Sequence, residues 1–163
     1  MKNKIFIFLT FAVMIGLSVS CEKDETIVKL TDNPVYPVVV TVPNLTFSLA
    51  HATDTLVFGC SPVDVGFQAS TKYILEACVS GKGFTTKETM RIYFGDSYAD
   101  IKTTVEKVNK LFKGKKIAAG VRSAVDFRVR AQITVDAGTG ALGSSTNPLQ
   151  YISETVTDST TTY

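Results

Sequence analysis

The sequence is poor in the residues that build catalytic and metal sites. Its 163 residues include no Trp, one His and three Cys. The single His51 excludes a site with several His ligands, and no two Cys have the spacing of a zinc site. A Ser-His-Asp triad would depend on His51, which stands at an expected strand end without a nucleophile-elbow motif. We therefore expect no catalytic residue and no metal site, and we interpret His51 as a surface or capping residue.

An excess of charge of one sign is also missing. The chain has 17 Lys and Arg against 15 Asp and Glu, a formal charge of +2, which is too little for the concentrated basic surface of a nucleic-acid reader. The segment 138–143 has the letters of a dinucleotide-binding loop, but no β-α-β pattern surrounds it. The acidic residues are scattered, whereas a glycosidase needs two that face each other in a cleft. We expect no enzyme, no cofactor and no nucleic-acid partner.

The chain lacks a hydrophobic run of membrane-spanning length, but a shorter run stands near its start. Lys2 and Lys4 precede the mostly apolar residues 5–17. A run of about 13 residues matches a signal-peptide core and falls short of the ~20 needed for a transmembrane helix. Residues 1–20 are therefore predicted to be a signal peptide. The two lysines account for the whole charge excess, so the rest of the chain carries 15 cationic and 15 anionic side chains.

The junction at Cys21 resembles a bacterial lipobox, in which the Cys thiol receives a diacylglycerol. Ser18 departs from that pattern, because Leu is usual there. Ordinary signal-peptidase cleavage would leave Cys21 free, but a Cys at the junction favours lipidation. The acidic run 22–25 resembles the export signal of Bacteroidetes outer-membrane lipoproteins, and a solvated tether would have the same composition. We predict residues 21–34 to be a lipidated acidic tether on the exterior of the outer membrane, with Cys21 as the lipid attachment site.

Alternating residues predict that the two remaining cysteines point in different directions. Cys60 shares a strand face with Leu56 and Phe58, which should be the core face. Cys78 shares a face with Glu76, which should be the solvent face. We therefore favour two unpaired thiols over a Cys60–Cys78 disulfide, and interpret Cys60 as a small buried hydrophobe.

Short segments with period-two alternation and β-branched residues predict a chain made mostly of strands. The predicted strands cover residues 36–42, 45–49, 54–60, 71–79, 89–94, 124–135 and 149–156. In the strand 124–135, the apolar set begins at Phe127 and should face the core, while the polar set with Arg128 and Arg130 should face water.

One segment changes to a helical period. The apolar residues of this segment, spaced as on one helix face, are Ile101, Val105, Val108, Leu111 and Phe112. Asp96 or Ser97 can cap its start, and Ser97 with Asp100 has the form of a capping box. Gly114 suits the position just after the last turn. The pattern as a whole predicts an all-β, immunoglobulin-like or fibronectin-III-like sandwich of about seven strands with one short crossover helix. The irregular strand spacing and the helix disfavour a closed barrel.

The order of these segments resembles a known family. After the lipobox and acidic tether come Thr55–Cys60, Lys72–Glu76, Ser80–Phe84, Val108–Leu111, Val125–Ala131 and Thr146–Pro148. This order resembles the N-terminal immunoglobulin-like domain of the SusE/SusF family of Bacteroidetes outer-membrane lipoproteins. The resemblance covers residues 35–157, and we expect 158–163 to be a polar tail.

The resemblance implies a place in a polysaccharide-utilisation system for starch or another glycan, with a Sus-type transporter complex and polysaccharide as partners. In the family, glycans are held by domains that come after the N-terminal one. The resemblance therefore implies a non-enzymatic accessory or spacer module. Two alternatives are a direct, weak glycan-binding protein and a protein-docking, adhesin-like module. Sugar rings stack on aromatic faces, so without Trp the expected glycan contacts are Phe67 and Tyr98, which lie in predicted loops.

Overall fold

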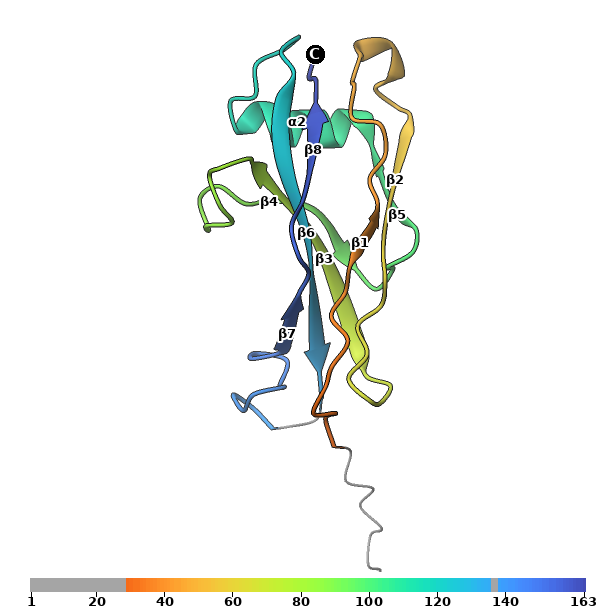
Figure 1. Ribbon diagram of the computed structural model, residues 1–163, viewed down its shortest axis with the longest axis vertical. Helices are drawn as coiled ribbons and strands as arrows, with labels where there is room; N and C mark the ends of the chain where they lie inside the picture. Colours follow the sequence, from red (N-terminus) through yellow and green to blue (C-terminus); the bar gives the residue numbers. More distant parts are fainter. Residues whose placement is uncertain (1–28, 136–137) are drawn as a thin grey trace, which may run out of the picture.

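The computed structural model describes residues 29–135 and 138–163, and it shows an antiparallel β-sandwich with one α-helix (Figure 1). In chain order the described elements are β1 (Val39–Thr41), the 3-10 turn η1 (Leu49–His51), β2 (Thr55–Cys60), β3 (Ser70–Val79), β4 (Met90–Gly95), β5 (Ile101–Thr104), α2 (Val105–Gly114), β6 (Ser123–Thr134), β7 (Leu149–Ile152) and β8 (Val156–Thr160).

The strands form two separate sheets. One has the order β1-β2-β5, and the other has the order β4-β3-β6-β7, with β8 paired to the first half of β6. Every pairing between these strands is antiparallel. The predicted all-β sandwich with a crossover helix is therefore confirmed. The single strand expected over 149–156 is divided into β7 and β8, which pair with the two halves of β6.

The core lies between the sheets and follows the predicted alternation. The register places Tyr73 opposite Ala131, and Leu75 opposite Val129. These four side chains are buried against the inner face of the other sheet. Phe58 on β2 meets Phe127 on β6 with ring centroids 5.9 Å apart. Burial of such apolar faces is the main favourable contribution to folding.

Helix α2 closes one end of the sandwich. Val108 and Phe112 are fully buried, and the Phe112 ring stacks on Phe47 at 6.0 Å. The Thr104 Oγ1 accepts a hydrogen bond from the Lys107 N–H, as an N-cap does. The first N–H groups of a helix lack partners within it. Here the N–H groups of Val105 and Glu106 donate to the turn between η1 and β2.

The predicted start of this helix was wrong. Residues 101–104 form strand β5, which pairs with β2, and Ser97 lies in a loop where its hydroxyl donates to the Asp100 carbonyl. Ile101 is buried in both interpretations, because positions 101 and 105 share a face in a helix and also in a strand. The helix extends through Gly114, and the left-handed residue after it is Lys116, with φ of 64°.

Two other expectations need correction. The strand expected over 45–49 is reduced to a bridge between Thr46 and Thr161, and Leu49 is 74% exposed in η1. Residues 158–163 are not a polar tail, since β8 extends to Thr160 and the side chains of Thr160 and Thr162 are buried. Their hydroxyls donate to backbone carbonyls, which satisfies them without water.

The described chain enters and leaves the sandwich at opposite ends of its long axis. Figure 1 shows the first described residues at the lower end and the C-terminus at the upper end beside α2. The entering segment is held there by backbone bonds from Thr31 N–H to Val65 O and from Val35 N–H to Asp64 O. We call residues 29–35 the N-terminal strap.

Candidate functional site

A cavity of about 720 Å³ opens at the end of the sandwich that holds the N-terminal strap. Its walls come from the loop between β2 and β3 and the loop between β4 and β5, and it includes the ends of β3 and β6. The residues that line it are Pro62, Val63, Asp64, Val65, Gly66, Phe67, Gln68, Ala69, Thr71, Tyr73, Asp96, Tyr98 and Ile133. Its volume lies in the range of sites for small ligands.

The structure brings together the two aromatic residues nominated from the sequence. Phe67 is half-buried and Tyr98 is 40% exposed, and both line this cavity. The Tyr98 ring lies against Tyr73, with centroids 5.6 Å apart and planes inclined by 52°. The Tyr73 hydroxyl accepts a hydrogen bond from the Val63 N–H at 3.2 Å. The cavity therefore has aromatic surface on two of its walls.

Polar contacts hold the two loops in place. Asp64 Oδ1 accepts from the Gly66 N–H at 2.8 Å, and the Ser97 N–H donates to the Tyr93 hydroxyl at 3.1 Å. Asp96 forms an ion pair with Lys72. Burial raises the pKa of Tyr73, and the bond from Val63 opposes that effect. Tyr73 is therefore a neutral phenol at physiological pH, and the cavity presents hydroxyl and carboxylate groups beside aromatic rings.

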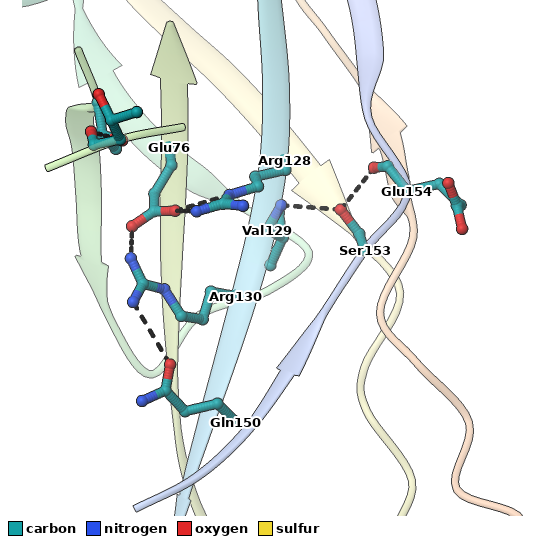
Figure 2. A network of polar contacts seen from close by, with 9 residues as sticks. Glu76, Arg128, Val129, Arg130, Gln150, Ser153 and Glu154 are labelled. Atoms are coloured by element: carbon teal, nitrogen blue, oxygen red, sulfur yellow. Dashed lines mark hydrogen bonds and ion pairs between the residues drawn. The ribbon is translucent and has the colours of Figure 1, made fainter. Parts of the chain in front are cut away.

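A second polar feature, which the sequence did not indicate, lies on the outer face of the four-stranded path β4-β3-β6-β7. Glu76 was expected to face solvent, but it is only 1% exposed. Figure 2 shows its carboxylate between two arginines of β6. Arg128 donates from Nε and Nη2 to Oε2, both at 2.9 Å. Arg130 pairs with Oε1 and donates to Gln150 Oε1 at 3.4 Å.

The prediction for this face failed because long side chains cover it. The Arg128 guanidinium lies 4.1 Å from the centroid of Phe84, in the loop after β3, and burial lowers the pKa of Arg128. Charged side chains with long apolar stems can bury what lies beneath them. The usable signal in the sequence is the alternation of Arg128 and Arg130, which places both on the face of Glu76 once β3 and β6 pair.

The break between β7 and β8 is bridged by Ser153. Its N–H donates to Val129 O at 2.9 Å, and its hydroxyl accepts from the Val129 N–H at 2.9 Å (Figure 2). The same hydroxyl donates to Glu154 O at 2.8 Å. This side chain replaces a ladder bond of β6, so the edge stays paired across the irregularity.

The two described cysteines are free and buried. Cys60 faces the core as predicted, and burial raises its pKa to about 11. Cys78 lies on the opposite face of β3 to the core residues, as the alternation indicated, but that face is covered and burial raises its pKa too. Both thiols are protonated at neutral pH, which makes them poor nucleophiles.

His51 is the only His of the sequence, so its surroundings bear on any catalytic or metal site. His51 is exposed, and its Nδ1 lies 2.8 Å from Asp54 Oδ2, next to η1. Within residues 29–135 and 138–163, no three His, Cys, Asp or Glu side chains gather closely enough to hold a metal ion. In the same residues, no helix has the length and apolar character needed to cross a bilayer.

These features define a class: an immunoglobulin-like β-sandwich module with an aromatic-lined cavity at one end, and with its N-terminal strap and Tyr163 at opposite ends of the long axis. The family is given by sequence comparison. A model of the SusE outer membrane protein family matches residues 22–130, so the chain belongs to that family. Membership indicates an outer-membrane component of a Sus-like system. Searches of curated proteins and of solved structures found no significant match. The predicted signal peptide and Cys21 lie outside the described residues.

Proposed function

We propose that this protein is a lipid-anchored, surface-exposed, non-enzymatic spacer module of a polysaccharide-capture system. The observation that carries the proposal is the position of the N-terminal strap relative to Tyr163. The N-terminal strap and Tyr163 lie at opposite ends of the long axis (Figure 1). Strand β6 alone has 12 residues, which corresponds to roughly 40 Å at ~3.3 Å per residue. A module built in this way spans a long distance between its strap and its α2 end.

The short distance from Cys21 to the fold supports the same function. Seven residues, 22–28, separate Cys21 from the first described residue, and the eight steps of an extended chain cover at most ~3.5 Å each, or about 28 Å. A lipidated Cys21 would hold the strap end of the sandwich near the membrane and direct the α2 end outward. The family match begins at residue 22, directly after this Cys.

The anchor is tested by metabolic labelling with a clickable fatty acid, comparing the natural protein with Cys21→Ala. We expect labelling of the natural protein and none of the variant, with the variant released from the membrane fraction. Exposure is tested on intact cells with a membrane-impermeant amine reagent. The proposal is overturned if the natural protein carries no acyl chain. It is also overturned if the reagent labels the lysines of the protein in lysed cells but not in intact cells.

A second candidate function is direct, weak glycan binding in the cavity, because Phe67 and Tyr98 both line it. Titration calorimetry against neutral and acidic soluble polysaccharides tests this function. Phe67→Ala and Tyr98→Ala should each abolish any heat of binding. Tyr36→Ala is the matched control, since Tyr36 is an exposed aromatic residue that does not line the cavity. Silence of the natural protein across the panel would leave the spacer and protein-docking functions, and glycan hydrolysis by the pure protein would contradict a non-enzymatic role.

A further inference from the structure

The strap end of the sandwich exposes several large apolar side chains. Leu30, Val35 and Tyr36 are exposed in and just after the N-terminal strap. Leu142 is 65% exposed in the loop between β6 and β7. Figure 1 shows the strap and the described part of this loop, residues 138–148, both at the lower end of the molecule. Apolar surface left in water at one end of a protein marks a contact with another molecule or with a membrane.

Few charged residues accompany these side chains. Those of the strap, of the loop 61–69 and of residues 138–148 are Lys29, Asp32 and Asp64. Lys72 and Asp96, at the margin of this end, form an ion pair with each other, and Asp136 lies outside the described residues. At the other end of the molecule, residues 105–116 of α2 and the turn after it contain five Lys and one Glu. Because removing a charge from water is costly, the strap end is the one that leaves water more readily.

Backbone hydrogen bonds close this end of the sandwich. The N–H groups of Val35 and Asp64 each donate to the carbonyl of the other residue, at 2.8 and 3.0 Å. In the loop between β6 and β7, the Val135 N–H donates to Gly143 O and the Gly143 N–H donates to Asn147 O, both at 2.7 Å. Unpaired backbone groups are costly in the apolar part of a bilayer, and these bonds pair several of them. They also hold the loops in place, so a contact here orders little that is not already ordered.

Tyr36 has the chemistry of a residue at a lipid–water interface. Its ring packs edge-on against Tyr151, with centroids 5.5 Å apart and planes inclined by 71°, and about half of the residue stays exposed. Tyrosine is enriched at membrane–water interfaces, because its ring is apolar and its hydroxyl is polar. The contact with Tyr151 fixes the position of this ring beside the strap.

The predicted anchor indicates which surface this end meets. Cys21 precedes the first described residue by eight steps of the chain, at most about 28 Å, so an acyl chain on Cys21 brings the bilayer within reach of the strap. An anchor at Cys21 is a single point of attachment, and one point does not set the tilt of the long axis. Apolar contacts at the strap and at Leu142 supply further points.

We propose that the strap end, through Leu30, Val35, Tyr36 and Leu142, rests in the interfacial layer of the lipid bilayer and holds the sandwich upright on the membrane. The inference rests on the proposed anchor at Cys21 and adds a second contact with the same membrane. Membrane attachment is stable when two signals combine, here the acyl chain and this apolar surface. The α2 end, with its lysines, is then held at a fixed height in water.

The contact is tested on vesicles with the chain from Cys21 onward, without the predicted signal peptide. Its Cys21 thiol is coupled to a maleimide-headgroup lipid in phosphatidylcholine vesicles, and Cys60 and Cys78 are buried, so the maleimide reacts at Cys21. The chain has no Trp, so Leu142→Trp introduces a single fluorophore at the strap end. Leu49→Trp is the matched control, because Leu49 is 74% exposed and lies beside α2.

Phosphatidylcholine with bromine atoms near the headgroup end of its acyl chains quenches a tryptophan that enters the interface. We expect brominated vesicles to lower the emission of Leu142→Trp by about half, with a blue shift, and that of Leu49→Trp by less than about a tenth. Adding Leu30→Asp to Leu142→Trp should remove most of the quenching, because a carboxylate resists desolvation. Adding Val40→Asp on β1, at another exposed apolar position, should leave it unchanged.

The inference is overturned if Leu142→Trp is quenched no more than Leu49→Trp, or if Val40→Asp removes the quenching as fully as Leu30→Asp does. Quenching of both tryptophans would mean that the sandwich lies on its side, which also contradicts upright docking. Far-UV circular dichroism of each variant checks that the fold is intact. The anchor and the contact fail separately: missing acylation in cells overturns the anchor, whereas the vesicle measurement supplies the anchor chemically and reports on the contact alone.

Discussion

At the scale of the residue, Glu76 determines what lies on the outer face of its sheet. A carboxylate that is 1% exposed must be paired, and Arg128 and Arg130 provide that pairing. Ile74, which the register places opposite Arg130, is also fully buried on this face. This outer layer of the sheet is therefore a small polar core, held by ion pairs and a cation–π contact.

Removing the Glu76 carboxylate should be strongly destabilising. Glu76→Ala leaves two guanidinium groups without their shared counter-charge, so we expect the free energy of unfolding to fall by about 3 kcal/mol. Urea denaturation measures the effect. Lys72→Ala is the control, because its ion pair with Asp96 is largely exposed and should contribute less than about 1 kcal/mol. Equal losses in the two variants would contradict a structural role for the buried pair.

Cys60 gives the fold a specific sensitivity to alkaline pH. Its pKa is raised from 9.0 to about 11 by burial, so the folded state keeps a proton that the unfolded state releases. This stabilisation is complete below pH 9 and is lost as the pH rises to about 11, by about 2–3 kcal/mol. Unfolding free energies at pH 8 and pH 11 should therefore differ more in the natural protein than in Cys60→Ala. The same difference in both proteins would show that Cys60 is not the group responsible.

Sequence alternation located these residues but could not assign their exposure. Cys60 was correctly placed in the core because its own sheet face is apolar along β2. Cys78 and Glu76 were placed in solvent because a charged residue normally marks the wet face of a strand. Their burial depends on Arg128, about 50 residues later in the chain, and on Phe84, so it becomes visible only when β3 and β6 are paired.

At the scale of the element, the junction between β5 and α2 shows how one apolar stripe can serve two periods. Ile101 and Thr103 face the core as alternate residues of β5, and Val105 begins the helix on the same side. The stripe favoured one continuous helix because positions 101, 105 and 108 also fit a helical period. Residues 101–104 form a strand because β5 pairs with β2. A local sequence pattern does not contain the identity of that pairing partner.

The two proposed starts of α2 can be separated by mutation. Thr104→Ala removes the acceptor for the Lys107 N–H and should lower the free energy of unfolding by about 1 kcal/mol. Ser97→Ala removes only a loop contact with the Asp100 carbonyl and should cost less than about 0.5 kcal/mol. Thermal denaturation of both variants is sufficient. A larger loss in Ser97→Ala would favour the earlier helix start that the sequence indicated.

At the scale of the whole molecule, the N-terminal strap joins the entering chain to the cavity wall. Gly66 has φ of +86°, and a side chain there would meet Thr31 Cβ at 3.1 Å. Its neighbours Asp64 and Val65 hold the strap through backbone bonds. The loop that lines the cavity is therefore the same loop that receives the tether.

Gly66→Val should release this strap. Gly81→Val is the matched control, because Gly81 has a similar φ of +80° with no atom within 4 Å of an added Cβ. Both variants carry the strain of a left-handed residue, of order 1 kcal/mol, but only Gly66→Val pushes against Thr31. Hydrogen exchange should therefore become faster at Thr31 and Val35 in Gly66→Val alone. Unchanged protection there would mean that the strap is held by other contacts.

The sandwich architecture could be predicted from the sequence, but the C-terminal residues and the loops that form the cavity could not. The alternation of apolar and polar residues in β3 and β6 is long enough to define two sheet faces, and it therefore predicts a sandwich. The last residues looked like a tail because Thr and Ser are polar, yet the hydroxyls of Thr160 and Thr162 bond to buried carbonyls. The sequence nominated Phe67 and Tyr98 as loop aromatics that could contact a glycan, but it did not predict the cavity that they line, because the cavity walls join loops that are far apart in the chain.

The positions of the N-terminal strap and Tyr163 also determine how the fold would respond to a mechanical load. A pull between the N-terminal strap and Tyr163 would act along the strands, because the strap and Tyr163 lie at opposite ends of the long axis (Figure 1). Ladder hydrogen bonds lie perpendicular to the strands, so those between β8 and β6 would be sheared together and would not open one after another. A module with this geometry would bear tension along its strands, and would yield abruptly at high force.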